Sequence, residues 1–353
     1  MKEKIYVGIL FGGKSAEHEV SLQSAKNVYD AINRDKYIPV LIGITKKGEW
    51  TKCDVKKFLK NVDNPMTIKL VDSGDKVALI PGCQGKLYNL SKNKFEEKLD
   101  VVYPLLHGPN GEDGTVQGLL KLADVPFVGA GVLGSAVGMD KDAMKRMLRD
   151  AGIPIGKFIS LKMSDKLPSY NSITKKVGEP FFVKPANMGS SIGVSKVSSN
   201  SEYQKAVKEA FKHDYKIIIE EYIIGRELEC SVIGNDNPIA SAVGEVIPTK
   251  DFYSYDAKYI DDDGAILKIP ADLPEKIVKE VQKIAVATFK ALYCSGLGRV
   301  DCFLQKDGKI LVNEINTIPG FTKISMYPKL WAVNGIRYPE LIDRLIAYAL
   351  ANK

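Results

Sequence analysis

The sequence predicts a protein that combines α/β and α+β parts, and three observations carry this prediction. An apolar run followed by a glycine-rich turn and a helix-like stretch occurs twice in the N-terminal part of the chain. Further on, "PFFVKPANMGSSIGVSKV" has the pattern of a strand, a Gly/Ser-rich loop and a second strand. Near the C-terminus an Asp-Gly pair separates two alternating runs, as in a β-hairpin. We therefore expect an N-terminal doubly wound parallel sheet, followed by a small and then a larger α+β unit.

The bulk composition is typical of a chain with two or three compact domains. Of 353 residues, 45% are hydrophobic and 26% are charged, and we find no internal repeat or long linker. The net charge of +7 comes from 50 basic and 43 acidic residues that are spread along the chain. Because no basic run forms, small anionic substrates are favoured over nucleic acid as partners.

The cysteines and the N-terminus indicate a cytoplasmic protein. Five cysteines without a C-x-x-C pair predict neither a disulfide framework nor a zinc site. The apolar run after "MKEK" has only the length of a strand, which is too short for a signal peptide or a membrane span.

The N-terminal unit begins with "IYVGILF", which we expect to form a buried parallel strand. Gly12 and Gly13 then turn the chain into a helix whose inward side chains recur from Val20 to Ile32, and "YIPVLIGI" forms the next strand. Residues 51–98 are polar and are expected to be irregular. "LDVVYPLLHGPNGEDGTVQGLLKLADVPFVG" then repeats the order of strand, glycine-rich loop, helix and short strand.

The first strand overlaps a literal match to the phosphate-binding P-loop pattern, which runs from Gly8 to Ser15. A P-loop needs its variable residues in a loop, so that backbone N–H groups wrap the phosphates. Here Ile9 to Phe11 continue the apolar strand, and only "GGKS" remains for the turn. The match is therefore interpreted as coincidence, although a P-loop nucleotide switch stays an alternative function.

The stretch "LGRVDCFLQKDGKILVNEINTIPG" allows a strand register to be predicted. Asp307-Gly308 favours a two-residue type I′ turn, in which Lys306 faces Lys309. Counting outward from this turn places two pairs of polar residues on one face of the hairpin: Asp301 opposite Glu314, and Arg299 opposite Asn316.

Two carboxylates directly opposite each other need a positive charge nearby, because like charges across a ladder destabilise it. Arg299 alone could supply this charge in a buried ion cluster. However, Asp301, Glu314 and Asn316 together offer only oxygen ligands, which Mg²⁺ prefers and shares with nucleotide phosphates. We therefore expect a magnesium site here, and a β-bulge would alter its register.

Two further stretches are candidates for holding a nucleotide. Lys184 ends a strand, and the loop that follows it contains Ser190 and Ser191 between glycines, so it could close over phosphates. An ordinary glycine-rich connection is the alternative. The run "IIIEEY" ends a buried strand in Glu220, Glu221 and Tyr222, where backbone groups and a carboxylate could meet an adenine edge; a solvated charged turn fits equally well.

Taken together, the motifs resemble the ATP-grasp superfamily and, within it, the D-alanine:D-alanine ligases. The motifs that carry this resemblance run in family order from residue 12 to residue 331: "GGKSAEHEVSLQSA", "LLHGPNGEDGTVQGLL", "GMDKDAMK", "FFVKPANMGSSIGVSKV", "EEYIIGRELECSV", "DFYSYDAKY", "GRVDCF" and "VNEINTIPGFTKISMYPKLW". The resemblance implies a three-domain ATP-grasp architecture, which we divide into residues 1–129, 130–220 and 221–353.

For this family the resemblance implies ATP bound between the central and C-terminal domains. The implied ATP contacts are Lys141, Lys184, Ser191 and Lys258 on the phosphates, Glu220, Glu221, Tyr222 and Ile223 around the adenine, and Glu227 on the ribose. Asp301, Glu314 and Asn316 are implied to hold two Mg²⁺ ions, for which Mn²⁺ can substitute. The implied reaction joins two D-alanines through a D-alanyl phosphate, for peptidoglycan precursor synthesis, and a homodimer is usual.

The resemblance also implies roles for residues around the two D-alanines. Glu17 and His107 would meet the first D-alanine, Arg299 and the N–H of Gly320 would stabilise the oxyanion, Ser190 and Tyr259 would join a lid to Glu17, and Ser325 and Met326 would bind the second D-alanine. Taken alone, His107 is equally readable as a loop cap and Tyr259 as a core residue.

The preferred second substrate is D-alanine. Relatives that make D-alanyl-D-serine commonly carry Arg where this chain has Met326, and those that make D-alanyl-D-lactate lack the "SYDAKY" form of the loop. A D-alanine:D-serine ligase is the nearest alternative, and a more distant ATP-grasp carboxylate-amine ligase is the next.

Overall fold

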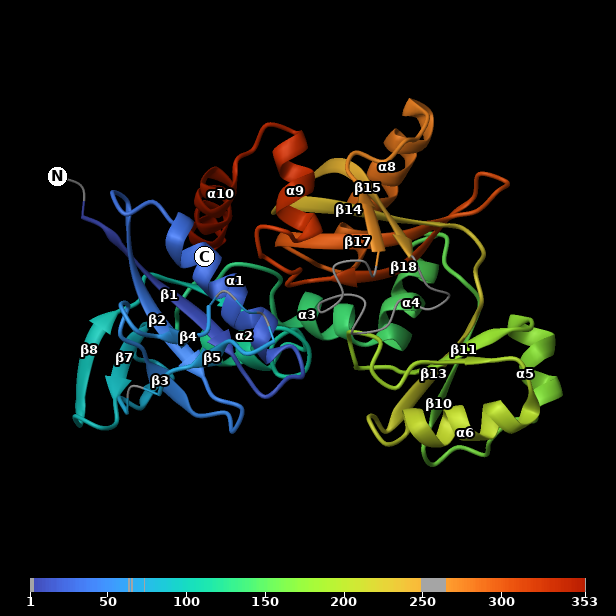
Figure 1. Cartoon of the computed structure of the whole chain (residues 1–353), viewed down its shortest axis with the longest axis horizontal. Helices are drawn as coiled ribbons and strands as arrows, with labels where there is room; N and C mark the ends of the chain where they lie inside the picture. The colour runs from blue at the N-terminus through green and yellow to red at the C-terminus, as the bar shows by residue number, and fades with distance from the viewer. Residues whose placement is uncertain (1–2, 63, 65, 73, 249–264, 353) are drawn as a thin grey trace.

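The computed structural model describes residues 3–62, 64, 66–72, 74–248 and 265–352 and contains three main sheets. Figure 1 shows them as three lobes: a blue and cyan N-terminal lobe, a yellow-green middle lobe and an orange lobe that lies between and above them. Within the described part of the chain, no helix is both long and apolar enough to cross a membrane.

The N-terminal lobe is the predicted doubly wound unit with one antiparallel edge. Its sheet has the order β3-β2-β1-β9, and its strands are β1 (Ile5–Gly12), β2 (Tyr37–Ile44), β3 (Trp50–Lys52) and β9 (Val101–Leu105). β1 pairs in parallel with β2 and β9, whereas β3 is antiparallel to β2. Alternate residues of β1 face opposite cores: Ile9 packs with α1 (His18–Ala31), and Leu10 packs with α2 (Thr115–Leu122). Helices therefore cover both faces.

β1 continues to Gly12, so Ile9 to Phe11 lie in the strand, as the interpretation of the P-loop match requires. Gly12 and Gly13 both have positive φ angles, +93° and +98°. A Cβ at Gly12 would lie 2.3 Å from the carbonyl oxygen of Ile44, so this turn requires glycine.

Residues 51–98 are more ordered than predicted. They form a two-stranded sheet and a three-stranded sheet from short strands: β4 (Leu59–Lys60), β5 (Lys69–Leu70), β6 (Val77–Leu79), β7 (Lys86–Asn89) and β8 (Lys94–Lys98). These strands are too short for a clear alternating pattern, which explains the difference. Conversely, the short strand expected after α2 is reduced to one bridge between Val102 and Phe127.

The middle lobe is an antiparallel sheet that is covered on one face by two helices. Its order is β10-β13-β11-β12, with β10 (Phe158–Lys162), β11 (Phe181–Pro185), β12 (Ser195–Val197) and β13 (Lys216–Glu221). Phe181, Val183, Ile217 and Ile219 pack against α5 (Tyr170–Val177) and α6 (Asn200–Ala210). The alternate side chains Lys184 and Glu220 therefore lie on the face without these helices.

The third lobe is a five-stranded antiparallel sheet with the order β16-β15-β14-β17-β18. Its strands are β14 (Arg226–Gly234), β15 (Ile239–Pro248), β16 (Ala265–Lys268), β17 (Gly296–Leu304) and β18 (Ile310–Asn316). α8 (Glu275–Ala291) packs on it, and so does α4 (Lys141–Asp150), which shares its core through Met144 and Leu148. α3 (Val132–Met139) precedes α4, and α9 (Met326–Val333) contacts β14 and β15. The assignment of residues 130–150 to the central unit stays a prediction.

The hairpin β17–β18 has the predicted pairs, although its turn differs from the prediction. Asp301 lies opposite Glu314 and Arg299 opposite Asn316, which confirms both pairs. Near the turn, however, Leu304 pairs with Ile310 and the register differs by one residue, since Gln305 rather than Lys306 faces Lys309. An irregularity between Asp301 and Cys302 then restores the expected register.

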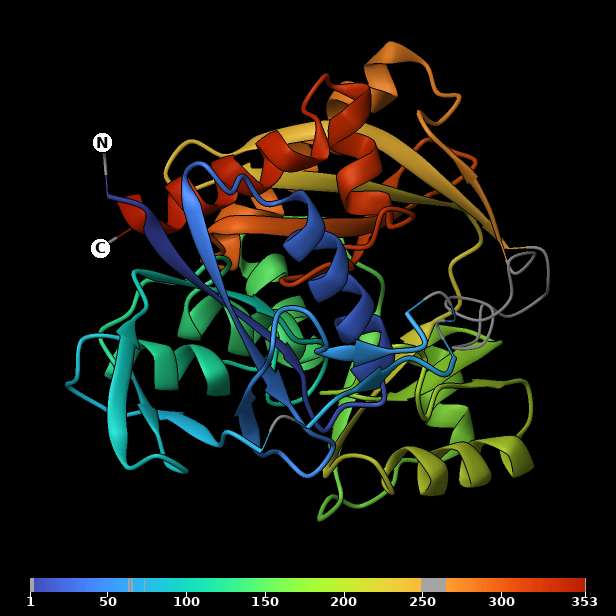
Figure 2. The same ribbon diagram turned by 60° about the vertical axis from the view of Figure 1, so that its left-hand side comes forward.

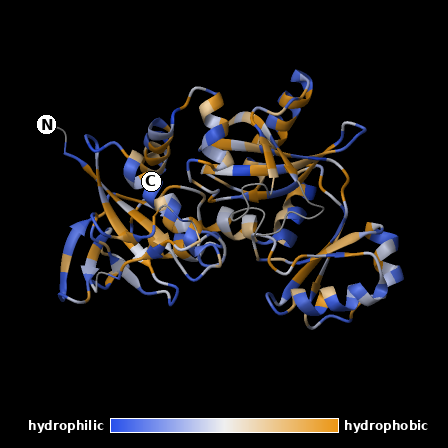
Figure 3. Ribbon diagram, viewed as in Figure 1, coloured by the Kyte–Doolittle hydropathy of each residue, from blue (hydrophilic) through white to orange (hydrophobic). Residues whose placement is uncertain are grey.

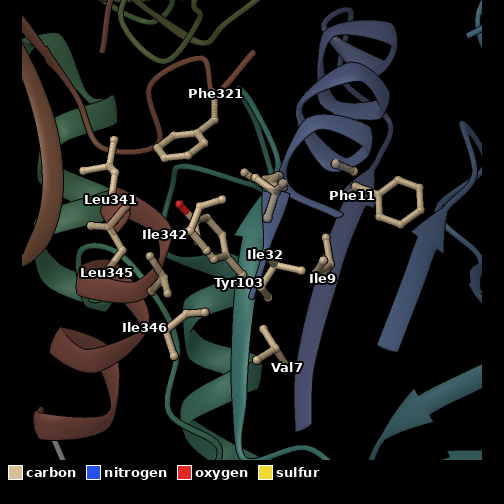
Figure 4. Close-up of a cluster of buried hydrophobic side chains, with 14 of the residues drawn as sticks. Val7, Ile9, Phe11, Ile32, Tyr103, Phe321, Leu341, Ile342, Leu345 and Ile346 are labelled. Atoms are coloured by element: carbon tan, nitrogen blue, oxygen red, sulfur yellow. The ribbon is translucent and has the colours of Figure 1, made fainter. Parts of the chain in front are cut away.

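The last helix, α10 (Tyr338–Ala351), returns to the N-terminal lobe. It contacts α1 and β9 on one side and β14 and β17 on the other, so it lies between two lobes (Figures 1 and 2). Figure 4 shows how its apolar side chains point toward β9 and the segment after β18: Leu341, Ile342, Leu345 and Ile346 against Tyr103 and Phe321. In Figure 3 the apolar residues gather along the strands and inner helix faces, and the outer helix faces are hydrophilic. The apolar contacts of α10 thus fix the N-terminal lobe to the lobe of the five-stranded sheet.

Candidate active site

The polar face of the hairpin carries an ion cluster centred on Arg299. The guanidinium donates to both oxygens of Asp301 at 2.7 Å and lies 2.9 Å from Glu229 on β14. Asn316 donates to Asp301 at 3.0 Å. The structure thus contains the arginine cluster that the sequence left open as the alternative to a metal site, with Glu229 as a member that sequence reasoning missed.

The donor set of this face nevertheless fits a divalent cation. Asp301, Glu314 and Asn316 project from one face and offer carboxylate and amide oxygens, the ligands that Mg²⁺ takes. Among the described residues, no group of three or more His, Cys, Asp or Glu side chains is arranged to hold a metal ion. Two carboxylates and one amide are therefore a partial shell, of the kind that phosphates and water complete.

Lys141 brings a positive charge from α4 to this face. It is buried at the first position of the helix, and its ammonium donates to the carbonyl of Met188 at 2.7 Å and lies 3.8 Å from Glu314. Met188 directly precedes the glycine-rich loop. Lys141 therefore links the hairpin carboxylates to the start of that loop.

Glu220 is held between two lysines on the open face of the middle sheet. Lys145 of α4 lies 2.9 Å from one of its oxygens, and Lys184 of β11 pairs with the other. Burial opposes the ionisation of Glu220, but the charges of the two lysines outweigh it and lower the pKa of Glu220 to about 2. Burial also opposes the charge on Lys184, but Glu220 and Glu314 prevail and raise the pKa of this ammonium. Lys145 was missed by sequence reasoning, although its i,i+4 spacing from Lys141 places both on one helix face.

The strand exit after Glu220 lies at the edge of the same region. Glu221 accepts the backbone N–H of Lys157 at 2.7 Å, so its carboxylate serves the turn. The exposed Tyr222 ring lies under the ammonium of Lys196 at 4.3 Å. Ile223 packs against Gly156, and Glu227 lies on β14 between β15 and β17.

Glu17 lies in a second group of residues, at the entrance to α1. Its side chain is buried and contributes to a cavity of about 140 Å³ that also includes Lys14, Asn110 and Gly189. A Cβ added at either Gly108 or Gly189 would lie 3.6 Å from the same oxygen of Glu17. Two glycine-containing loops from different lobes thus close on one carboxylate.

His107 is buried beside this group. Its Nδ1 lies 3.0 Å from the carbonyl oxygen of Ile318, the second residue after β18. Burial lowers the pKa of His107, against the opposing effects of Glu17 and the Ile318 carbonyl, so the ring is neutral near pH 7. Its Nε2 has no hydrogen-bond partner among the described residues. His107 thus contacts a segment outside its own loop, and its role in the site stays a prediction.

The segment after β18 carries the remaining predicted residues. A Cβ at Gly320 would lie 3.0 Å from the hydroxyl of Ser325, which caps the segment by accepting the N–H of Thr322 at 3.0 Å. Ser325 directly precedes α9, and Met326 is buried at the first position of this helix.

Two of the predicted residues lie in the Gly/Ser-rich loop after β11, and two lie in a part of the chain that is not described. Ser190 and Ser191 follow β11 with positive φ angles of +53° and +60°, so the loop adopts a left-handed turn. Lys258 and Tyr259 lie outside the described residues, and their roles stay predictions.

The comparisons with known proteins agree with this arrangement. Residues 6–130 match the family model "D-ala D-ala ligase N-terminus" and residues 147–347 match "D-ala D-ala ligase C-terminus". The chain is 52% identical over 352 residues to a D-alanine–D-alanine ligase from Oceanobacillus iheyensis, covering 99% of this chain and 96% of the relative.

Two solved structures are similar over nearly the whole chain. The structure of the D-alanine-D-alanine ligase from Coxiella burnetii has a TM-score of 0.86 at 38% identity and covers 99% of this chain and 94% of its own. The VanG D-Ala:D-Ser ligase from Enterococcus faecalis has a TM-score of 0.87 at 36% identity and covers 98% of this chain and 100% of its own.

The lysine pair around Glu220 predicts a pH-dependent stability. The two lysines stabilise ionised Glu220 in the folded state, so this residue adds to the free energy of unfolding at pH values above the ordinary glutamate pKa of about 4.5. The contribution is lost as the pH falls toward the folded-state pKa of about 2. In chemical unfolding, wild type should exceed Glu220→Gln in free energy of unfolding by on the order of 3 kcal/mol near neutral pH. The difference should shrink below about pH 4.5, because protonated Glu resembles Gln. Glu221→Gln, outside the lysine pair, is the control, and a difference that stays constant with pH would contradict the charge argument.

Proposed function

This chain belongs to the D-alanine–D-alanine ligase family, and from this we propose that it joins two D-alanines into D-alanyl-D-alanine while converting ATP to ADP and phosphate. The observation that supports the chemistry most directly is the convergence of three lobes. A Cβ at Gly189 of the middle lobe would lie 3.6 Å from Glu17 of the N-terminal lobe, and His107 of that lobe contacts Ile318 after β18. Lys141 joins Met188, before the glycine-rich loop, to Glu314 of the five-stranded sheet. A ligation of this kind supplies a cell-wall peptidoglycan precursor.

The proposed reaction has two steps. A carboxylate oxygen of the first D-alanine attacks the γ-phosphorus of ATP, which forms D-alanyl phosphate and releases ADP. The amine of the second D-alanine then attacks the acyl carbon, the C–O bond to phosphate breaks, and the amine loses a proton as the peptide bond forms. Because the reacting oxygens are anionic, positioning and charge neutralisation are the main demands on the protein.

We propose that Asp301, Glu314 and Asn316 hold two Mg²⁺ ions, or Mn²⁺ in their place. When bound, the ions would neutralise the phosphate charge and orient the transferred phosphoryl group. Arg299 already lies on this face, so its guanidinium can stabilise an oxyanion beside the carboxylates. The N–H of Gly320 is the proposed second oxyanion donor.

The ATP site is proposed between the middle sheet and the five-stranded sheet. Lys141, Lys184 and Ser191 would contact phosphates, with Lys258 joining them; Glu220, Glu221, Tyr222 and Ile223 would surround the adenine, and Glu227 would bind the ribose. Lys184 pairs with Glu220, so its ammonium lies between the residues proposed to contact the phosphates and those proposed to surround the adenine. This position supports the proposed placement of ATP.

The first D-alanine is proposed to bind in the cavity beside Glu17. Its ammonium group would meet the Glu17 carboxylate and the accepting Nε2 of neutral His107. Ser190 and Tyr259 would complete a lid over Glu17, which keeps water from the acyl phosphate. Ser325 and Met326 would receive the carboxylate of the second D-alanine.

D-serine as the second substrate is the nearest alternative, supported by the similarity to VanG. The buried, apolar Met326 favours D-alanine, because it offers no charged group to a serine hydroxyl. We further propose that the protein works in the cytoplasm, where ATP is available, and as a homodimer.

The first test of this function is substrate-dependent ADP release. ADP release should rise steeply when D-alanine is added, and mass spectrometry should identify D-alanyl-D-alanine as the product. A P-loop nucleotide switch would not respond to D-alanine. Offering D-alanine and D-serine together decides the subtype, and faster incorporation of D-serine as the second residue would overturn the preference stated above.

The proposed metal ligands predict a loss of turnover without unfolding. Asp301→Ala or Glu314→Ala should lower Mg²⁺-dependent turnover by on the order of 10³-fold, because phosphate charge would be left unbalanced. Circular dichroism and the melting temperature should show a retained fold. Asp307→Ala, at the exposed tip of the same hairpin, is the matched control and should keep wild-type turnover. Equal turnover in all variants would refute the metal assignment.

Substitutions at Lys14 and Glu17, which line the same cavity, distinguish the P-loop interpretation from the ligase interpretation. Glu17→Gln should raise the KM for D-alanine by about 10- to 100-fold, since a charged hydrogen bond to the ammonium is lost. Lys14→Ala should leave the KM for ATP unchanged. The opposite result, with ATP binding lost in Lys14→Ala, would restore the P-loop.

A further inference from the structure

Glu112 connects two segments that lie 206 residues apart in the chain. It belongs to the loop between β9 and α2, and its two carboxylate oxygens accept different backbone N–H groups. One oxygen accepts the N–H of Gly108 at 2.9 Å, and the other accepts the N–H of Ile318 at 3.0 Å. Gly108 follows His107, and Ile318 lies in the segment that leads to Gly320. The side chain thus spans the N-terminal lobe and the segment after β18.

Ile318 is held at both of its backbone groups. Its N–H donates to Glu112, and its carbonyl oxygen lies 3.0 Å from Nδ1 of His107. Phe321, three residues on, is held in the same way: its N–H donates to the hydroxyl of Ser24 at 3.4 Å, and its carbonyl accepts the hydroxyl of Tyr338 at 2.5 Å. Gly320 therefore lies in a segment whose two ends are fastened to the N-terminal lobe and α10.

The contact with Ile318 also decides which nitrogen of His107 carries the proton. A carbonyl oxygen can only accept, so Nδ1 of His107 must be the donor. Burial lowers the pKa of His107, so the ring is neutral and Nε2 is left as an acceptor. This Nε2 has no hydrogen-bond partner among the residues described. If Ile318 moved, the tautomer of His107 would no longer be defined.

We propose that Glu112 is a positioning residue for the first-substrate site: by holding Ile318 and Gly108, it fixes the His107 tautomer and the backbone around Gly320. The inference rests on the proposed function, since it assigns the means by which His107 and Gly320 are placed.

The electrostatics around Glu112 agree with a cationic substrate in this place. Burial first, then the charge of Glu17 and, to a smaller extent, that of Glu314 raise the pKa of Glu112 to about 8, while the two N–H donors oppose this rise. A positive charge beside Glu17 would offset the repulsion between the two carboxylates. The ammonium group of an amino acid supplies such a charge.

The experiment compares Glu112→Gln with Asp113→Asn. Asp113 is the matched control, because it also accepts two backbone N–H groups, those of Asn110 and Thr115 at 2.8 and 3.0 Å, but neither lies in the segment after β18. The kinetics are measured above pH 8, where Glu112 is ionised and both of its oxygens accept. Gln keeps the length of Glu but turns an N–H₂ group toward one of the two donors. We expect Glu112→Gln to raise the KM for the first D-alanine and to lower kcat, so that kcat/KM for this substrate falls by about 10²-fold. The KM for ATP and the melting temperature should stay near those of wild type, and Asp113→Asn should keep wild-type kinetics.

A spectroscopic measurement reports the tautomer directly. The chain has only three histidines, so ¹⁵N NMR of labelled protein can resolve His107, with His107→Asn used for assignment. Wild type should show the Nδ1–H tautomer, and Glu112→Gln should show a mixture. A merely structural role would not move this signal.

A shorter acid provides a second test if Glu112→Gln does not fold. Glu112→Asp keeps the charge but cannot span both N–H groups, so it should show the same loss of D-alanine kinetics. The proposal is overturned if either variant keeps wild-type kinetics, as Asp113→Asn should. It is also overturned if the KM for ATP rises by the same factor as the KM for the first D-alanine, or if the variant melts at a clearly lower temperature than wild type. Failure of the wild type to make D-alanyl-D-alanine would refute the proposed function instead, and the two failures are therefore distinguishable.

Discussion

Two carboxylates placed directly opposite each other on β17 and β18 are the constraint on which the rest of the site depends. Asp301 and Glu314 would repel each other, so the surrounding elements bring positive charge to them. Arg299 pairs with Asp301 from within the same strand, and Lys141 approaches Glu314 from α4. The same demand suits the proposed chemistry, because groups that balance these carboxylates can also balance phosphate and oxyanion charge.

The segment after β18 connects the hairpin to the N-terminal lobe through hydrogen bonds. Glu112 and His107 hold Ile318, and Ser24 and Tyr338 hold Phe321, so the backbone around Gly320 is determined by elements from both ends of the chain. The apolar contacts of α10 support these hydrogen bonds, since they pack the same segment against β9 (Figure 4). A backbone N–H group is an effective oxyanion donor only if it is fixed before the reaction, and this packing provides that rigidity.

In the hairpin, the two predicted pairs of polar residues are present, although the register beside the turn differs from the prediction. The Asp-Gly signal correctly located the turn, but Gln305 rather than Lys306 faces Lys309, which moves the register by one residue. The irregularity beside Asp301 moves it back, so both predicted pairs are present. Neither deviation has a strong sequence signal, because a bulge is chosen by the packing of the whole sheet.

The sequence by itself determined the elements whose cause is local: the buried strand to Gly12, the amphipathic α1, the Gly/Ser-rich loop after β11 and the polar face of the hairpin. It also contained the ordered motifs that resemble the ligase family. Only the tertiary structure decided that Lys145 neutralises Glu220, that Glu229 joins Arg299, and that Glu112 reaches Ile318. Lys145 and Glu112 reach partners in other parts of the fold, and Glu229 and Arg299 lie on neighbouring strands that are far apart in the chain. A buried charge is paired by whichever residue the packing brings near, and periodicity along the chain does not encode this.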